Sequence, residues 1–394
     1  MDGWKTATEE ERVPEEAVRL LKKLLAIPSV NGRDDEGKAA EFLCDYLKGA
    51  GIPARVQRLD ERHANVVAVL EGGDSEHPLI WNGHLDTVPY GNLEEWHMDP
   101  AVPEEKDGFL YGRGASDMKS GLAAMVYALC AVSRSGRRPA RTVRFLGTCD
   151  EEKGGLGARA ILRDGLMIPG AELLVGEPTG CRLGVAQKGC LWLEIQAAGK
   201  TSHGAYPEQG INAVEQAVAL AMELKAYVER FSHPILGVST VQITEISGGI
   251  APNMTPDACR LLLDIRMTPG LTGAMVTEQA RKLEEIRRRA AAGRFQAEFR
   301  IQNERRAIEI SDSHPMTRSL REAMQAAGLS IEQTGINYFT DASILVGEDP
   351  EAAVLLFGPG EPDLAHKPDE RVSLELYGKA IEILTRFLQP EVKL

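Results

Sequence analysis

The chain has 394 residues, enough for two or three domains with their own buried cores. With 43% hydrophobic and 26% charged residues, its composition is that of a globular protein. The formal net charge of -13 argues against nucleic acid and anionic membrane as partners, because neither surface attracts an acidic protein, although solubility alone would also account for it.

Apolar strands alternate with helices in the first half of the chain. Helical spacing of apolar residues predicts helices over 14–26, 34–47 and 121–131, and short apolar runs predict strands over 64–70, 78–81, 142–146 and 173–175. This alternation implies an α/β domain with a mostly parallel sheet and helices on both faces. The pattern resumes near the end of the chain with a helix over 313–327, a strand over 353–357 and a helix over 374–388.

The middle of the chain has a different pattern. Its predicted elements, in order, are a strand over 190–197, a helix over 212–227, strands over 239–246 and 259–267, a helix over 273–290 and a strand over 295–301. This β-α-β-β-α-β order is typical of a ferredoxin-like α+β domain. We therefore expect a domain at 190–305, inserted into a discontinuous domain formed by 1–189 and 306–394.

The cysteines and the N-terminus bear on the compartment. The six cysteines form no C-x-x-C pair, and a chain of this size does not need disulfides, so we expect reduced thiols. The first sixteen residues are polar and acidic and contain no apolar stretch of a secretory signal, and no window has the apolar length of a membrane span. These features favour a cytoplasmic protein.

Five segments place a possible metal ligand at the end of a predicted strand or in a loop behind one. They are Gly83-His84-Leu85-Asp86-Thr87, the run from Gly112 to Lys119 around Asp117, Asp150-Glu151-Glu152, Gly176-Glu177-Pro178-Thr179, and the run from Ala365 to Glu370 around His366. In open α/β sheets, ligands bind outside the carboxyl ends of the strands, so distant segments can converge there. Residues i and i+2 of an extended segment point to the same side, so Asp86 could orient the imidazole ring of His84.

Each candidate taken alone also has an ordinary structural explanation. His84 and His366 could be a core and a loop histidine, and Asp117 could cap the helix that follows it. Glu177 could be a turn residue. Three adjacent carboxylates at 150–152 usually form a solvated turn, but they repel one another and are better explained beside bound cations.

The set is more specific than its members. His84, Asp117, Glu152, Glu177 and His366 supply two imidazoles and three carboxylates, which suit two zinc ions with three protein ligands each if Asp117 bridges them. The charges of three carboxylates, two zinc ions and one bridging hydroxide then cancel. A nicotinamide oxidoreductase is not supported, because Asp117 replaces the third glycine of the fingerprint that would begin at Gly112.

These motifs resemble those of one family, the metallopeptidases and aminoacylases that include acetylornithine deacetylase, succinyl-diaminopimelate desuccinylase, glutamate carboxypeptidase and related dipeptidases. The resemblance runs from about residue 14 to residue 388, and the metal segments occur in the family's order. It implies two ligand sets for zinc: His84 with Glu177, and Glu152 with His366, bridged by Asp117. Asp86 matches the carboxylate that orients the histidine, and Glu151 matches the general base.

The inserted domain resembles the lid of the same family. His203, in the run from Gly199 to Ala205, matches a histidine that helps to hold the reacting carbonyl oxygen and that comes from the partner subunit in dimeric relatives. Asn253 and Arg266 match positions that grip a substrate carboxylate, although Arg266 could instead be a strand-edge arginine paired with an acid. Thr340-Asp341-Ala342 resembles a family loop near the site.

The resemblance implies a metal-dependent hydrolase of amide or peptide bonds. In this mechanism a water that bridges two Zn²⁺ ions attacks the carbonyl carbon, and Glu151 accepts its proton and later delivers it to the leaving amine. Co²⁺ or Mn²⁺ could replace zinc, since N/O sites select metals partly by availability. We expect the substrate to be a small acylated amino acid or a short peptide with a free carboxylate, and the protein to be a homodimer through the lid domain.

The sequence and the resemblance leave three functions to distinguish. An N-acyl-amino-acid deacylase of the acetylornithine deacetylase or succinyl-diaminopimelate desuccinylase type is favoured. A carboxypeptidase or dipeptidase of the same family is the alternative; relatives with aspartate in place of Glu177 tend to be aminopeptidases or dipeptidases. A non-catalytic binding protein on the same scaffold would be expected to lack Glu151 or a zinc ligand, and this chain has them all.

Overall fold

The computed structural model describes residues 13–389, which form two compact units. Unit 1 comprises the chain up to residue 185 together with 310–335 and the part from 340 onward, and unit 2 comprises 186–309 and 336–339. The acid-rich residues 1–12, on which the expectation of no secretory signal partly depends, lie outside the described residues. Within 13–389, no helix is long and apolar enough to cross a membrane.

Unit 1 is built around a mixed sheet with the strand order β1-β2-β6-β3-β7-β17-β8. These strands are β1 (Ala54–Arg58), β2 (Ala64–Leu70), β3 (Asp74–His84), β6 (Arg141–Thr148), β7 (Glu172–Val175), β8 (Leu183–Gln187) and β17 (Ala353–Leu356). The central strands β6, β3, β7 and β17 are parallel, so their carboxyl ends lie at one edge of the sheet. The flanking pairings are antiparallel, and β8 also pairs with β15 (Ile308–Glu309) and β16 (Gln333–Ile336).

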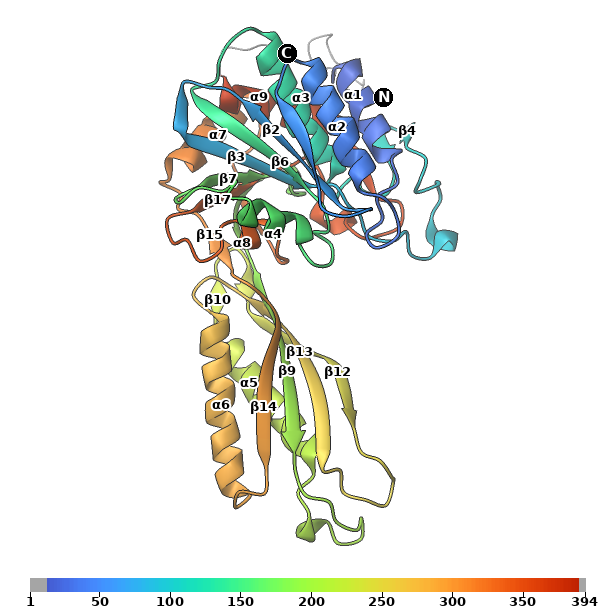
Figure 1. Cartoon of the computed structure of the whole chain (residues 1–394), viewed down its shortest axis with the longest axis vertical. Helices are drawn as coiled ribbons and strands as arrows, with labels where there is room; N and C mark the ends of the chain where they lie inside the picture. The colour runs from blue at the N-terminus through green and yellow to red at the C-terminus, as the bar shows by residue number, and fades with distance from the viewer. Residues whose placement is uncertain (1–12, 390–394) are drawn as a thin grey trace, which may run out of the picture. The chain divides into compact units, whose positions relative to one another are not determined.

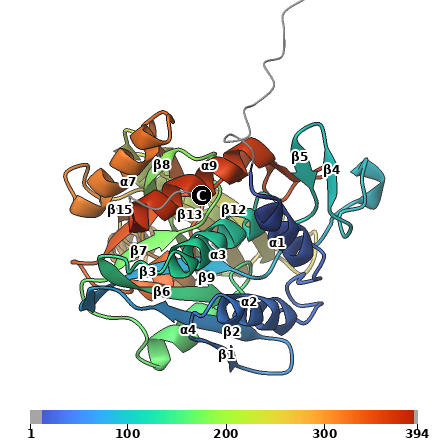
Figure 2. The same cartoon turned by 90° about the horizontal axis from the view of Figure 1, so that it is seen from above.

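Helices cover both faces of this sheet (Figure 1). One face carries α1 (Glu15–Leu25), α2 (Gly37–Gly49), α3 (Lys119–Arg134), α7 (Pro315–Ala326) and α9 (Leu374–Leu388), and the other carries α4 (Leu156–Arg163) and α8 (Ala342–Leu345). Figure 2 shows α3 and α9 side by side above the strands. Every residue of α3 from Lys119 to Cys130 is buried, so this helix lies at the centre of the layer. The predicted α/β class, with a mostly parallel sheet between two helical layers, is confirmed.

Several short elements of unit 1 were not predicted, because they are too short for a periodic pattern. They are the three-stranded sheet of β4 (Glu104–Lys106), β5 (Phe109–Tyr111) and β18 (Arg371–Ser373), and the 3₁₀ turns Leu93–Glu95 and Pro362–Leu364. The small sheet joins segments on either side of two predicted ligands, since β5 precedes Asp117 and β18 follows His366.

Unit 2 has a four-stranded antiparallel sheet in the order β14-β9-β13-β12. Its elements are β9 (Gly189–Ala198), α5 (Ala213–Val228), β12 (Thr240–Gly248), β13 (Ala258–Met267), α6 (Gly273–Ala290) and β14 (Gln296–Arg305), with a small hairpin of β10 (Ser232–His233) and β11 (Gly237–Val238). Alternate residues of the central strands, such as Leu261, Leu263 and Ile265, are fully buried in the core that α5 and α6 complete. The chain order is the β-α-β-β-α-β order predicted for a ferredoxin-like insert.

Candidate metal centre

The predicted ligands of unit 1 come from the carboxyl edge of the parallel strands. His84 is the last residue of β3, Glu152 and Glu177 lie in the loops after β6 and β7, and His366 lies in the loop after β17. Asp117 comes just before α3. Because parallel strands end at the same edge, segments distant in the sequence are brought together there.

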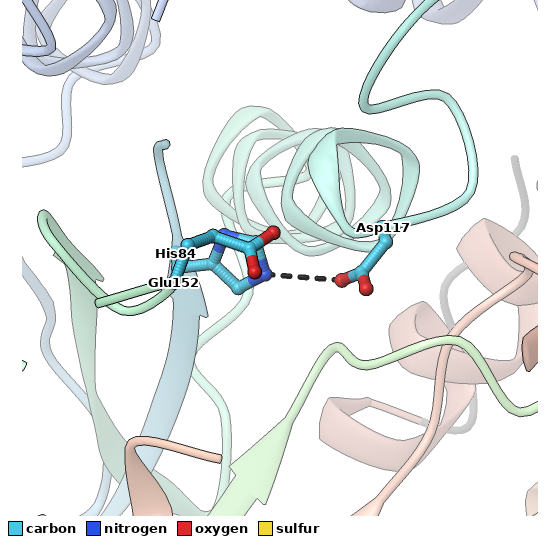
Figure 3. Close-up of side chains that lie close together, drawn as sticks. All are labelled: His84, Asp117 and Glu152. Carbon is cyan, nitrogen blue, oxygen red and sulfur yellow. Dashed lines mark hydrogen bonds and ion pairs between the residues drawn. The ribbon is translucent and has the colours of Figure 1, made fainter. Parts of the chain in front are cut away.

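Asp117 lies between two imidazoles. Its Oδ1 is 3.1 Å from Nε2 of His84, and its Oδ2 is 3.3 Å from Nε2 of His366. Nε2 of His366 is also 3.2 Å from Oε2 of Glu152. Figure 3 shows the imidazole of His84 pointing at the carboxylate of Asp117 with Glu152 beside it, and one ligand-type atom from each of these three residues lies within 4.8 Å of the others. Each oxygen of Asp117 thus faces a different histidine, as a bridging ligand requires.

Glu177 completes the acidic surroundings of His84. Only 2% of its surface is exposed, and its charge raises the pKa of His84. Close approach of two backbones brings its loop against α3: a Cβ atom on Gly121 would lie 1.8 Å from the carbonyl oxygen of Gly176. Only glycine fits at position 121, and this contact fixes the Glu177 loop beside the start of α3.

Burial, mutual repulsion and hydrogen bonds shift the pKa values of the carboxyl groups in the cluster. Burial raises the pKa of Glu177 well above its usual value, and the charge of Asp117 raises it further. Burial also raises the pKa of Glu152, against the opposing hydrogen bond from His366. Burial alone would raise the pKa of Asp117 too, but its hydrogen bonds with His366 and His84 outweigh burial and lower it.

The two imidazoles show the complementary shift. Burial opposes the protonated form of His84, yet the hydrogen bond with Asp117 and the charge of Glu177 raise its pKa well above 6.5. Hydrogen bonds with Asp117 and Glu152 raise the pKa of His366 to about 10. In the absence of a cation, therefore, the carboxylates favour the protonated form of both imidazoles. A site of two imidazoles and three carboxylates that gathers positive charge in this way fits divalent cations such as zinc.

Asp86 contacts the metal ligands in two ways. Nδ1 of His84 lies 2.9 Å from the backbone carbonyl oxygen of Asp86 and 3.6 Å from its carboxylate, so the carbonyl is the nearer acceptor for the ring. The carboxylate accepts hydrogen bonds from the backbone N–H groups of Glu151 and Glu152, each at 3.1 Å. The same residue therefore orients His84 and holds the loop that carries Glu151 and Glu152.

Glu151 has the properties of an unengaged base. Burial raises the pKa of its carboxyl group well above 4.5, and the charges of Asp341, Glu152 and Glu177 add to this shift against the opposing effect of His84. Within residues 13–389, its side chain makes no hydrogen bond or ion pair. Asp341 belongs to the Thr340-Asp341-Ala342 segment, so this predicted loop lies close enough to act on Glu151 electrostatically.

Glu370 supports the Asp117 loop, and the sequence alone did not reveal this role. It is 1% exposed, and its Oε1 accepts hydrogen bonds from the backbone N–H groups of Ser116 at 2.8 Å and Asp117 at 2.9 Å. Its Oε2 is 2.6 Å from the guanidinium of Arg113. The only sequence signal was an acidic residue shortly after His366, and nothing local linked it to position 117.

The three predicted site residues of unit 2 lie in two places. His203 is exposed and forms an isolated bridge with Met254, and the N–H of Gly204 donates to the carbonyl oxygen of Asn253 at 2.8 Å, so His203 and Asn253 are neighbours. Asn253 precedes the start of β13, whereas Arg266 is near its end. Eight residues of strand at about 3.3 Å each separate Arg266 from the start of β13 by about 26 Å.

Arg266 is paired within unit 2. Its Nε is 2.9 Å from Oδ1 of Asp264, and its Nη2 is 2.9 Å from Oδ2 of the same residue. The guanidinium carbon lies 5.6 Å from the ring centre of Phe339. This pairing with an acid is the structural alternative to a substrate-binding role for Arg266. The pair fixes the plane of the guanidinium while leaving 27% of the side chain exposed.

Comparison with known proteins gives a consistent result. The family model described as Peptidase family M20/M25/M40 matches residues 80–389. A Staphylococcus epidermidis protein described as a probable succinyl-diaminopimelate desuccinylase is 27% identical, with 94% of this chain and 96% of that protein covered. An acetylornithine deacetylase of Vibrio cholerae is 28% identical, with 92% and 94% covered. Among solved structures, a tripeptidase from Staphylococcus aureus superposes with a TM-score of 0.75 at 20% identity, over 96% of this chain and 99% of that one, which shows the shared fold.

Proposed function

Because the chain belongs to Peptidase family M20/M25/M40 and is a metal-dependent hydrolase of amide or peptide bonds, we propose that it is a di-zinc N-acyl-amino-acid deacylase. The observation that carries the proposal is a cluster of four side chains, in which each has a nitrogen or oxygen atom within 3.3 Å of such an atom in another: His84, Asp117, Glu152 and His366. Glu151, whose carboxyl group makes no hydrogen bond or ion pair within residues 13–389, adjoins Glu152. Such a site supplies both a place for two cations and a base next to them.

The two cations would share Asp117. His84 and Glu177 would hold one, and Glu152 and His366 would hold the other, because each oxygen of Asp117 faces a different imidazole. Cobalt or manganese would suit the same nitrogen and oxygen donors. When bound, the cations lower the pKa of water and polarise the carbonyl oxygen of the substrate.

Glu151 would act as the general base. Burial and the neighbouring carboxylates raise its pKa, which makes the carboxylate a stronger base. It would accept a proton from the attacking water and deliver it to the nitrogen of the leaving amine. Asp86 keeps Glu151 in place by accepting a hydrogen bond from its backbone N–H.

Substrate binding would involve two subunits. The start of β13, which Asn253 shortly precedes, is about 26 Å from Arg266 along the strand, and an acylated amino acid cannot span this distance. We therefore assign Arg266 to the substrate carboxylate and infer that His203 and Arg266 of one subunit serve different sites. His203 would reach the site of a partner and donate a hydrogen bond to the carbonyl oxygen as negative charge develops there.

A homodimer through unit 2 is supported by its free strand edge. β12 is the outermost strand on one side of the sheet, and Ile243 and Ile246 on this strand are 38% and 49% exposed. Met222 of α5 is 53% exposed, and α5 packs along β12. An edge strand with exposed apolar side chains readily pairs with a second copy.

The deacylase assignment, rather than a carboxypeptidase or dipeptidase, follows the relatives named as a desuccinylase and a deacetylase, which match over more than nine-tenths of this chain. The proposed compartment is the cytoplasm, where the six free, buried cysteines would remain reduced.

A substrate screen tests the proposal. Protein loaded with Zn²⁺ would be incubated with N-acetyl, N-succinyl and N-formyl amino acids and with simple dipeptides, and release of the free amine would be measured before and after treatment with a chelator. We expect release from an acylated amino acid that disappears with the chelator and returns with Zn²⁺. Hydrolysis of dipeptides alone would favour the peptidase alternative, and activity indifferent to chelator would reject the metal-dependent mechanism.

A further inference from the structure

The segment 29–36 before α2 packs against the loop that follows His84, with residues 29–31 and Glu36 buried and Gly32 and Arg33 exposed. Ser29 and Asn31 lie beside Thr87: the N–H of Thr87 donates to the carbonyl oxygen of Ser29 and the N–H of Asn31 donates to that of Thr87, both at 2.9 Å. Asn31 and Glu36 of this segment are 6% and 0% exposed. The segment contains none of the proposed metal ligands, yet it brings two buried polar side chains next to the metal centre.

The amide of Asn31 faces three carboxylates. Its Nδ2 is 2.9 Å from Oδ1 of Asp150, 3.1 Å from Oδ2 of Asp86 and 3.3 Å from Oε1 of Glu36. Because three acidic groups share the two N–H bonds of one amide nitrogen, Asn31 ties the segments of Asp86 and Asp150 to its own, which carries Glu36.

Glu36 holds the loop directly. Its Oε2 accepts a hydrogen bond from the backbone N–H of Asp150 at 2.9 Å. The next two N–H groups, those of Glu151 and Glu152, donate to Asp86. Three consecutive backbone N–H groups are therefore fixed by two buried carboxyl groups.

Local structure does not account for Glu36. It occupies the N-cap position of α2, but its side chain accepts no hydrogen bond from that helix. Burial, with the nearby charge of Asp86, raises its pKa to about 9. Burying a carboxyl group costs free energy, and an ordinary N-cap residue at this position would avoid that cost. Asp150, whose N–H donates to it, has a left-handed backbone with φ of 61°, a conformation that is uncommon outside glycine, asparagine and aspartate.

We propose that Glu36 and Asn31 are positioning residues that hold the 150–152 loop, and with it Glu151 and Glu152, in the geometry required at the metal centre. This inference rests on the proposed function for the roles of Glu151 and Glu152. Neither Glu36 nor Asn31 touches the substrate or a proposed ligand side chain, so both act through Asp150 and Asp86.

The test compares Glu36→Ala with Glu36→Gln. Alanine removes the acceptor for the N–H of Asp150, whereas glutamine keeps an oxygen acceptor and nearly the same volume. We expect Glu36→Ala to lower kcat and the affinity for Co²⁺ alone by about 10–100-fold, and Glu36→Gln to recover most of both. Hydrogen exchange of the 148–156 peptide should accelerate in the alanine variant and not in the glutamine variant.

Glu194→Ala is the matched control for lost stability. Glu194 is 6% exposed and accepts hydrogen bonds from Arg260 and Gln302, but it lies on β9 in unit 2. We expect this variant to lower Tm with wild-type kcat and wild-type exchange of the 148–156 peptide. The proposal is overturned if Glu36→Ala leaves exchange and Co²⁺ affinity unchanged, or if Glu36→Gln is as impaired as Glu36→Ala. If the wild-type protein hydrolysed no amide, the proposed function would fail, while exchange and Co²⁺ binding would still decide the role of Glu36.

Discussion

Unit 1 and unit 2 present their candidate site residues in opposite ways. In unit 1, His84 and Asp117 are almost fully buried, and each of the four residues His84, Asp117, Glu152 and His366 lies within 3.3 Å of another member of the set. In unit 2, His203 and Asn253 are exposed, and Arg266 is separated from them by most of the length of β13.

The difference follows from what each set has to bind. A metal site must hold mutually repelling carboxylates together before the cation arrives, and this requires burial and supporting hydrogen bonds such as those of Asp86 and Glu370. Residues that contact a substrate must remain reachable, so they are left on a surface. Unit 1 is therefore expected to function as a preformed site, and unit 2 to function only in an assembly.

The largest effect is expected for Glu151→Gln. Loss of the base should lower kcat by about 10²–10⁴, because glutamine cannot accept the proton from water. Metal content should stay at the wild-type level, since Glu151 is not among the proposed ligands. Both quantities can be measured on one preparation by steady-state kinetics and elemental analysis, and a wild-type kcat would remove Glu151 from the mechanism.

Mixing two impaired variants tests whether His203 and Arg266 of one subunit serve different sites of the dimer. His203→Ala and Arg266→Ala should each lower kcat/KM by about 10²–10³, the effect of losing one donor to the developing charge or to the substrate carboxylate. When the two are unfolded and refolded together, about a quarter of the wild-type activity should return, because half of the dimers of a two-fold assembly are mixed and each has one intact site. Refolding each variant alone is the control. No recovery in the mixture would place His203 and Arg266 in the same subunit's site.

Glu370→Ala examines the preformed character of unit 1. Removing its carboxyl group leaves the N–H groups of Ser116 and Asp117 without an acceptor and the buried Arg113 without its ion-pair partner. We expect metal affinity to fall by about 10–100-fold while saturating metal restores most of kcat. Affinity would be measured by competition with a chromogenic chelator. Unchanged affinity would mean that Asp117 is held by its other contacts.

The sequence predicted well what depends on local pattern and poorly what depends on contacts between loops. His84, Glu152 and Glu177 could be predicted as candidate ligands because each ends or follows an apolar strand, and parallel strands share an edge. The contacts of Glu370 with Asp117 and of Glu36 with Asp150 could not be found, since each joins loops more than a hundred residues apart without a repeating pattern. The helix α4 and the strand β8 were also missed: α4 has only eight residues, and Gly184 and Gln187 break the apolar run of β8 that the shorter β7 and β17 retain.

The smallest expected effect is the pH dependence of the metal-free protein. The folded-state pKa of His366, about 10, lies above the ordinary histidine value of 6.5, so its contacts with Asp117 and Glu152 stabilise the fold fully below pH 6.5 and lose this contribution as pH rises toward 10. Since half of the side chain is exposed, solvent screening should keep the contribution below about 1 kcal/mol. It would be measured with a chelator present, as the difference in free energy of unfolding between wild type and His366→Asn across this pH range.

Adding Zn²⁺ should reverse the sign of that dependence. A metal-binding imidazole must be deprotonated, so zinc competes with the proton for His366, and stabilisation by zinc should grow as pH rises. The His366→Asn variant should lose the share of this growth that comes from His366, because its side chain carries no proton that zinc must displace, while the share from His84 remains. If wild type gains the same stabilisation from zinc at pH 6 as at pH 9, His366 does not bind the metal, and only the buried residues of unit 1 would remain as candidate ligands.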